Sequence, residues 1–362
     1  MPEFVVKTAG GRYAAVVERG ILARTAEFVP VSAGKIFVIT TRDVWDAHGA
    51  ALDAALATKE RDVLYFPGGE ANKRLSQVEA LCDAMLHGGA DRSSSVIAFG
   101  GGIVGDVGGF VAASYMRGVK VLQIPTTLLA QVDAATGGKT GVNLVGGKNL
   151  LGAFHQPHAV LVDPTVLDTL PQREYVAGLY EVIKYGVIQT PWLFDLLEDK
   201  RDEVLGRDPD TVDTLIAESV RIKAEVVSAD ERESGLRRIL NFGHTLGHAL
   251  EAETRYERLL HGEAVGFGMI AATLLAERLG LLDKMSSESI VEVVNDYGPI
   301  PSLAGVEAEN LCARLFQDKK TIQGKVHFVL PESIGSVVVK SGIDPEEVLH
   351  ATRDALKRTR QA

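Results

Sequence analysis

Three histidines and one glutamate lie in apolar, helix-like stretches, where an unused polar side chain is costly. His244 and His248 are four residues apart, so both lie on one side of a predicted helix. His261 begins another helical stretch, and Glu181 lies within a third. A catalytic zinc ion typically takes three protein nitrogen or oxygen ligands and keeps one position open. The sequence therefore predicts a metal site, and leaves open whether His244 and His248 are both ligands or one is an acid–base group. The plainer alternative is a set of satisfied core histidines.

A glycine-rich loop follows a strand-like run that ends at Phe99. Gly100–Asp106 reads GGGIVGD and opens a helical stretch, a context in which backbone N–H groups approach a pyrophosphate at a helix N-terminus. A tight turn without a ligand is the alternative. No acidic residue lies about 20 residues further on, where a standard dinucleotide site has its ribose partner. Asp43 and Glu70, each just past a predicted strand, are the upstream candidates, so we expect a nucleotide site of different topology.

Two lysines lie in the same glycine-rich part of the chain. Thirteen of the 37 glycines fall between Gly100 and Gly152, together with Lys139, Lys148 and two asparagines. Either lysine alone would be read as a solvated surface residue. Together they indicate donors, presented from flexible backbone, for a phosphate or a polyhydroxylated substrate.

The predicted secondary structure around these residues changes near residue 165, from strands alternating with helices to mainly helices. Before it, four apolar strand-like runs alternate with helical stretches, which is typical of a mostly parallel sheet. These runs are Lys35–Thr40, Asp62–Phe66, Ser95–Phe99 and Val119–Ile124. After it the pattern is helical, in Glu174–Ile188, Thr211–Ala229, Ile239–Glu251, His261–Leu279 and Ser286–Asn295, with one strand-like run at Val326–Leu330. We predict a Rossmann-like α/β domain over residues 1–165 and a mainly α-helical domain over residues 166–362.

The composition excludes several classes of protein. The 362 residues are 46% hydrophobic and 24% charged, which is typical of globular chains and excludes disorder. The net charge of −10, without a long basic run, disfavours nucleic acid and anionic membranes as partners. The longest stretch without a charged residue, Asn149–Val162, is shorter than the ~18–20 residues of a membrane helix. The N-terminus lacks the pattern of a secretion signal. With Cys82 and Cys312 far apart, we expect buried thiols and a cytoplasmic protein.

The motifs taken together resemble those of the 3-dehydroquinate synthase family, over nearly the whole chain. Besides the glycine loop and the lysine segments, the resemblance rests on GEANK at residues 69–73, YMRG at 115–118, PTTLLAQVD at 125–133, AGLYEVIKYG at 177–186, NFGHTLGHALE at 241–251 and HGEAV at 261–265. It implies conversion of 3-deoxy-D-arabino-heptulosonate 7-phosphate into 3-dehydroquinate and phosphate in the shikimate pathway, with NAD and a divalent metal, usually zinc or cobalt. The implied steps are transient oxidation by NAD, phosphate elimination, re-reduction and intramolecular aldol closure.

The resemblance also implies a role for individual residues. The metal ligands would be Glu181, His244 and His261, with His248 in the substrate site near a proton transfer. NAD would contact Asp43 (the weaker match), Glu70, Lys73, Gly102, Ile103, Val104, Gly105, Asp106, Thr126, Thr127, Lys139, Lys148, Val166, Leu167, Asp168 and Thr169. The substrate site would include Asp133, Lys139, Lys148, Asn149, Lys184, Lys223, Arg237 and Asn241. Arg117 would reach the phosphate from a neighbouring subunit, which implies a homodimer, and a further phosphate lysine would be Lys319 or Lys320.

Three other functions compete with this interpretation. A cyclitol synthase of the same superfamily would act on sedoheptulose 7-phosphate or glucose 6-phosphate. His248, Gly138 and Lys139 keep the quinate-type pattern, and Arg237 suits a substrate carboxylate that those sugars lack. A metal-dependent polyol dehydrogenase would perform net oxidation, and an inactive NAD-binding scaffold would need neither the metal residues nor the lysines.

Overall fold

The computed structural model describes residues 2–317 and 326–362, so Lys319 and Lys320 lie outside the described residues. By their contacts the residues form two compact units. The first consists of Met1–Pro171 and Ile216–Arg232, and the second of Gln172–Leu215 and Glu233–Ala362. The chain thus leaves the first unit, returns to it at Ile216 within α8 (Pro209–Ala229), and leaves it again after Arg232. The predicted domain boundary near residue 165 stays a prediction.

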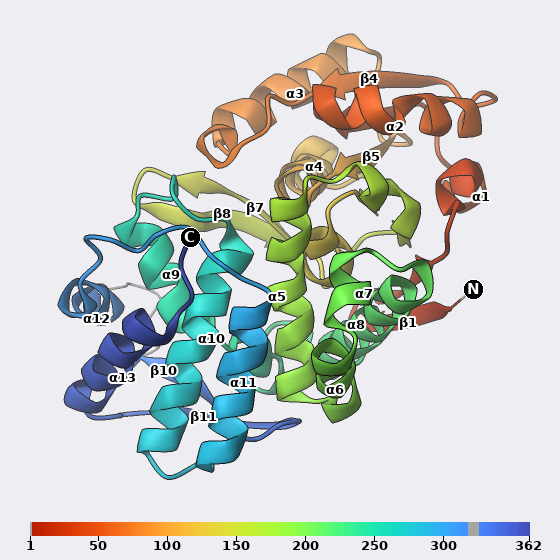
Figure 1. Ribbon diagram of the computed structural model, residues 1–362. Helices are drawn as coiled ribbons and strands as arrows, with labels where there is room; N and C mark the ends of the chain where they lie inside the picture. The colour runs from red at the N-terminus through yellow and green to blue at the C-terminus, as the bar shows by residue number, and fades with distance from the viewer. Residues whose placement is uncertain (1, 318–325) are drawn as a thin grey trace. The chain divides into compact units, whose positions relative to one another are not determined.

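A seven-stranded sheet forms the centre of the first unit (Figure 1). Its order across the sheet is β1 (Glu3–Thr8), β2 (Gly11–Val17), β9 (Ala159–Val162), β6 (Lys120–Pro125), β5 (Ser95–Gly100), β3 (Ile36–Thr40) and β4 (Arg61–Tyr65). Only the β1–β2 pair is antiparallel. The predicted fold class, a Rossmann-like unit with a mostly parallel sheet, is confirmed. The four predicted strands are present within one or two residues. Among them β3, β5 and β6 lie inside the sheet and read as apolar sequence because both their faces are covered, whereas β4 is an edge strand with no buried residue.

Helices cover both faces of this sheet. On one face α3 (Leu75–His87) and α4 (Gly102–Ser114) bury Val78, Leu81 and Val107 against the strands. On the other face α2 (Arg42–Ala55) buries Leu52, beside the short turns η1 (Ile21–Arg24) and α1 (Thr25–Phe28). Thr41 is at the N-cap position of α2, and Asp43 lies in the first turn of that helix.

The strand order reverses between β3 and β5, and the glycine-rich loop follows β5 at this point. In open α/β sheets, ligands bind in the crevice beyond the carboxyl ends of the strands at such a reversal. Gly108 allows α4 to lie close to the sheet, because a Cβ there would be 2.9 Å from the Cβ of Ala98. Loop and helix are therefore held firmly against the strand that precedes them.

The two lysines of the glycine-rich segment lie on a β-hairpin, not in flexible loops as the sequence suggested. β7 (Lys139–Leu144) pairs antiparallel with β8 (Gly147–Phe154). The glycines serve the pairing: a Cβ on Gly152 would lie 2.0 Å from the carbonyl oxygen of Thr140. The strand signal is weak in the sequence because both strands contain glycine and only Thr140 and Val142 are β-branched.

The second unit is mainly helical, as predicted. It contains α5 (Gln172–Ile188), α6 (Pro191–Asp199), α7 (Arg201–Leu205), the start of α8, α9 (His244–Glu253), α10 (His261–Arg278), α11 (Lys284–Asp296), α12 (Ala308–Gln317) and α13 (Pro345–Arg358), with the hairpin β10 (His327–Ser333) and β11 (Ser336–Ser341). Helix α10 lies in the middle of this unit (Figure 1), and its residues 262–276 are all buried. The predicted helix over Ile239–Glu251 is wrong at its start. A 3-10 turn, η6 (Leu236–Asn241), precedes α9, and Gly243 between them has a left-handed φ of 80°.

The described part of the chain contains no helix that is long and apolar enough to cross a membrane.

Candidate metal centre and dinucleotide loop

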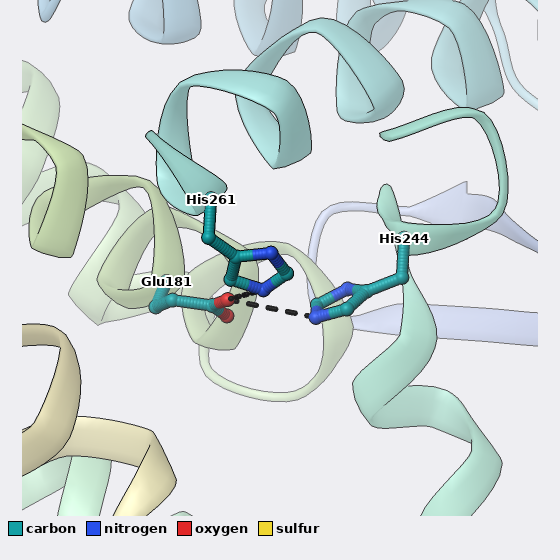
Figure 2. A group of neighbouring side chains, drawn as sticks. All are labelled: Glu181, His244 and His261. Atoms are coloured by element: carbon teal, nitrogen blue, oxygen red, sulfur yellow. Dashed lines mark ion pairs between the residues drawn. The ribbon is translucent and has the colours of Figure 1, made fainter. Parts of the chain in front are cut away.

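Helices α5, α9 and α10 each contribute one side chain to a cluster in the second unit, in which Glu181 is fully buried and His261 is partly exposed. Glu181 comes from the middle of α5, His244 begins α9 and His261 begins α10. Figure 2 shows the two imidazoles pointing toward the carboxylate. The Nε2 atoms of His244 and His261 each lie 3.5 Å from the same oxygen of Glu181, Oε1. Three donor atoms therefore converge on one point.

Glycines bring these three helices close enough for the cluster to form. A Cβ on Gly262 would lie 1.8 Å from the carbonyl oxygen of Ala177, one turn before Glu181 on α5. A Cβ on Gly268 would lie 1.8 Å from the carbonyl oxygen of Gly243, the residue before His244. Since neither position tolerates a side chain without movement of the backbone, helix packing fixes where the three side chains meet.

The separations fit a tetrahedral metal ion better than a hydrogen-bonded core cluster. Two ligands about 2.1 Å from a tetrahedral zinc lie about 3.4 Å apart, close to the 3.5 Å found here. That separation is long for a hydrogen bond. The other oxygen of Glu181, Oε2, lies 2.5 Å from the Lys184 ammonium, and both side chains are buried. A carboxylate with one oxygen held by a cation and the other aimed at two imidazoles is a donor set suited to a divalent ion.

Burial and charge act differently on the two imidazoles. Burial lowers the pKa of His244 to about 4, so this ring is neutral and can offer a lone pair at neutral pH. Burial would also lower the pKa of His261, but the nearby carboxylates of Glu181 and Glu251 outweigh it and raise that pKa to about 10. The two carboxylates thus attract positive charge strongly at the His261 side of the cluster.

His248 lies beside the cluster but not in the same donor set. Its ring is T-shaped to His244 at 5.4 Å between centroids and stacked on His261 at 5.7 Å. The donor atoms of Glu181, His244 and His261 form one group within 4.8 Å, whereas His248 groups with Glu251 and His261. The helix spacing correctly places the two histidines of α9 on one side. In the structure His244, and not His248, shares a donor group with Glu181.

Two acidic residues were missed by the sequence reasoning: Glu251, which contacts His261, and Glu233, which contacts Asn241 in the turn before α9. Glu233 accepts a hydrogen bond of 2.5 Å from Nδ2 of Asn241, and Glu233 has a left-handed φ of 61°. Glu251 accepts one of 3.2 Å from Nδ1 of His261. Glu251 is seven residues after His244, two helical turns along the same face, and that spacing could have identified it. The fully buried Arg237 lies in η6 with Asn241.

In the first unit, Lys73 connects the glycine loop to the β-hairpin. Its Nζ lies 2.5 Å from Oδ2 of Asp106, in the first turns of α4, and 2.5 Å from Oδ1 of Asn149 on β8. Burial raises the pKa of Asp106, and the Lys73 ammonium opposes that rise. The Lys148 ammonium lies 3.6 Å from Oε1 of Glu70. Residues that are far apart in sequence thus meet at the start of α4, where unsatisfied backbone N–H groups favour an anion.

The other predicted NAD residues also follow strand ends of the first unit. Thr126 and Thr127 come directly after β6, and Thr126 N–H donates to the Gly100 carbonyl at 3.0 Å. Val166, Leu167, Asp168 and Thr169 lie in the 3-10 turn η5 (Pro164–Thr169) after β9. Asp43 lines a cavity of about 550 Å³ with Arg42, Asp46, Tyr65, Phe66 and Pro67, beyond β3 and β4. This is the strand-end position expected for a ribose partner.

Of the remaining predicted residues, Asp133 and Lys223 pair and Arg117 is exposed. Asp133 lies in a π-helical turn (Ala130–Ala134), and its Oδ1 is 2.7 Å from Nζ of Lys223 on α8, within the same unit. Lys139 is exposed at the start of β7. Arg117 has a left-handed φ of 70°. Asp133, by contrast, lies in a single π-helical turn, and such turns are frequent at functional sites.

Comparison with known proteins identifies the family. Family models described as 3-dehydroquinate synthase N-terminal and C-terminal match residues 63–177 and 178–321. A 3-dehydroquinate synthase of Solibacter usitatus (strain Ellin6076) is 62% identical over 356 residues, covering 98% of this chain and 100% of that protein. The chain belongs to the 3-dehydroquinate synthase family.

Two solved structures place this member of the 3-dehydroquinate synthase family among related cyclases. ValA, the 2-epi-5-epi-valiolone synthase of Streptomyces hygroscopicus subsp. jinggangensis 5008, was solved with NAD+ and Zn2+ bound. It is 32% identical with a TM-score of 0.88, covering 96% of this chain and 97% of that one. A 2-deoxy-scyllo-inosose synthase complexed with carbaglucose-6-phosphate, NAD+ and Co2+ is 25% identical with a TM-score of 0.87, covering 98% and 99%.

Proposed function

We propose that the protein converts 3-deoxy-D-arabino-heptulosonate 7-phosphate into 3-dehydroquinate and phosphate, with NAD and Zn2+ or Co2+ as cofactors. The observation that carries this proposal is the convergence of Glu181, His244 and His261 at tetrahedral spacing in a chain of this family. When bound, the metal supplies Lewis acidity toward a substrate hydroxyl and NAD supplies a reversible hydride acceptor.

The chain's own residues hold the metal and orient the substrate. Glu181, His244 and His261 are the proposed ligands. Lys184 neutralises the second oxygen of Glu181, which leaves Oε1 directed at the metal position. His248 lies next to the His261 ring and is exposed, so it can move a proton at a substrate atom beside the metal. Arg237 is the proposed partner of the substrate carboxylate, because a planar guanidinium binds carboxylate in bidentate fashion.

In the first unit, backbone and cations together are proposed to bind anions. The start of α4 presents N–H groups to the pyrophosphate of NAD, and Lys73 fixes that turn through Asp106 and Asn149. Lys139, Lys148 and Lys223 supply positive charge toward the substrate phosphate and toward negative charge that develops during phosphate loss. Val166–Thr169, Thr126, Thr127 and Asp43 are the further proposed NAD contacts.

We further propose a homodimer in which Arg117 serves the site of the neighbouring subunit. The exposed, left-handed backbone at Arg117 supports a role outward from its own subunit. Mixing the inactive variants Arg117→Ala and His261→Ala tests this. If the site is shared, refolded mixtures regain about a quarter of wild-type activity, since half of the dimers then contain one complete site. Mixtures that stay as inactive as the separate variants would contradict the shared site.

The cyclitol synthases are the nearest alternative. The 62% identity to a 3-dehydroquinate synthase, against 32% and 25% to the two cyclitol synthases, favours the heptulosonate as substrate. A direct test supplies the protein with NAD, zinc and each of three sugars: the heptulosonate, sedoheptulose 7-phosphate and glucose 6-phosphate. We expect phosphate release from the heptulosonate alone. Release from sedoheptulose 7-phosphate at an equal rate would assign the protein to the cyclitol branch.

The dehydrogenase and scaffold alternatives make other predictions. A dehydrogenase would accumulate NADH in proportion to substrate consumed, and a scaffold would bind no metal. Elemental analysis of the purified protein, expected to show one metal ion per chain, excludes the scaffold. We propose a cytoplasmic location, where Cys82 and Cys312, both free in the structure, remain thiols.

A further inference from the structure

The two imidazoles of the proposed metal centre are supported differently on their far sides. Nδ1 of His244 lies 3.1 Å from the carbonyl oxygen of Phe242, two residues earlier in the chain. Nδ1 of His261 lies 3.2 Å from Oε2 of Glu251, which comes from the last turn of α9. The Glu251 side chain is only 4% exposed, so the His261 ring is held by a buried carboxylate rather than a neutral carbonyl.

We propose that Glu251 is a positioning residue that sets the tautomer and the donor strength of His261. This rests on the proposed metal site. A carboxylate that accepts from Nδ1–H leaves the lone pair of His261 on Nε2, the nitrogen that faces Glu181. The negative charge also raises the basicity of the ring as a ligand.

His261 has particular need of such support. It is the first residue of α10, and its side chain is 34% exposed, against 12% for His244. Packing therefore restrains the His261 ring less, and a hydrogen bond from a second helix replaces that restraint. Glu251 lies on the same helix as His244, so one rigid element orients both imidazoles.

Zinc affinity, measured by competition with a chromogenic chelator, tests the proposal on wild type, Glu251→Gln and Glu251→Ala. Gln keeps an acceptor for Nδ1–H without the charge, whereas Ala removes both. We expect zinc affinity to fall about 10- to 100-fold in Glu251→Ala and by less in Glu251→Gln. Cobalt-substituted Glu251→Ala should also show a changed visible absorption spectrum, which a merely structural loss would not produce. Glu253→Gln, on the same helix, is the matched control and should change neither.

The outcomes separate this inference from the metal assignment itself. Failure of the wild type to bind zinc would overturn the metal site and this inference with it. Zinc affinity and cobalt spectra of both Glu251 variants equal to wild type would overturn only the inference. If wild type binds two zinc ions per chain and Glu251→Ala binds one with unchanged affinity, Glu251 would be a ligand of a second ion with His248, and the positioning role would be wrong.

Discussion

The candidate site of the helical unit is formed by side chains, whereas that of the α/β unit is formed mainly by backbone. The metal cluster depends on the identity of three side chains from three helices, whose meeting point is fixed by glycine contacts such as that of Gly262 with Ala177. The dinucleotide loop depends on backbone shape at the start of α4 and on one buried lysine, Lys73, that connects α4 to β8. Loss of a ligand should therefore abolish the first site outright, while the second should weaken in steps.

The largest effect is expected for His261→Ala. Only two protein ligands would remain, so we expect zinc to be lost and turnover to fall about a thousandfold or more, because the metal supplies several kcal/mol. Metal content and steady-state phosphate release check this. His350→Ala, an exposed histidine of the same unit, should behave as wild type. Full zinc content with a normal rate would refute the assignment of His261.

Gly262→Ala tests whether helix contact positions the ligands. The added methyl would meet the Ala177 carbonyl at 1.8 Å, so α10 must move away from α5. We expect the free energy of unfolding to fall by about 1–3 kcal/mol and zinc affinity to fall with it. Denaturant unfolding and zinc competition measure both. Gly10→Ala, where the methyl meets nothing within 4 Å, is the control. Unchanged zinc affinity would mean that the cluster does not depend on this contact.

Lys73→Ala should weaken NAD binding by the α/β unit and leave zinc binding by the helical unit unchanged. Removing a buried ammonium that holds Asp106 and Asn149 should lower NAD affinity about 10- to 100-fold, the cost of one or two charged hydrogen bonds. Zinc binding should stay at the wild-type level. NAD titration monitored by fluorescence or calorimetry provides the measurement, with the exposed Lys7→Ala as control. Equal loss of zinc and NAD binding would mean that the two sites do not depend on separate sets of residues.

The smallest effect is expected for Lys148→Ala. This lysine lies 3.6 Å from Glu70 and is partly exposed, so solvent screens its charge. We expect kcat/KM to fall about tenfold with the metal still bound, a cost of about 1.4 kcal/mol. Lys120→Ala, another exposed lysine of the same unit, should be neutral. Normal kinetics in Lys148→Ala would make it a surface residue.

Much of this fold could be predicted because buried strands and helices appear in the sequence as continuous runs of apolar residues. The strands β3, β5 and β6 are apolar runs, and α10 is apolar on every side. The hairpin β7–β8 could not be predicted, since only Thr140 and Val142 of its strand residues are β-branched and glycines lie in both strands. Likewise, α9 begins at His244 only because Gly243 adopts a left-handed backbone.

The candidate site was predictable in composition but not in arrangement. Helical spacing places His244 and His248 on one side of α9, and only the position of α10 decides which of them shares Glu181 with His261. The pairing of Asp133 with Lys223 joins residues 90 apart in sequence, which no local pattern reveals. Contacts of this kind come from helix packing and from the return of the chain to the first unit.

One sample in which phosphate and NADH are followed together tests the central claim most directly. With the heptulosonate, NAD and zinc, the account predicts continuous phosphate release, no NADH accumulation beyond the enzyme concentration, arrest on addition of a chelator, and recovery on addition of excess zinc. NADH that rises in step with substrate consumption, or phosphate release that continues in the chelator, would contradict it.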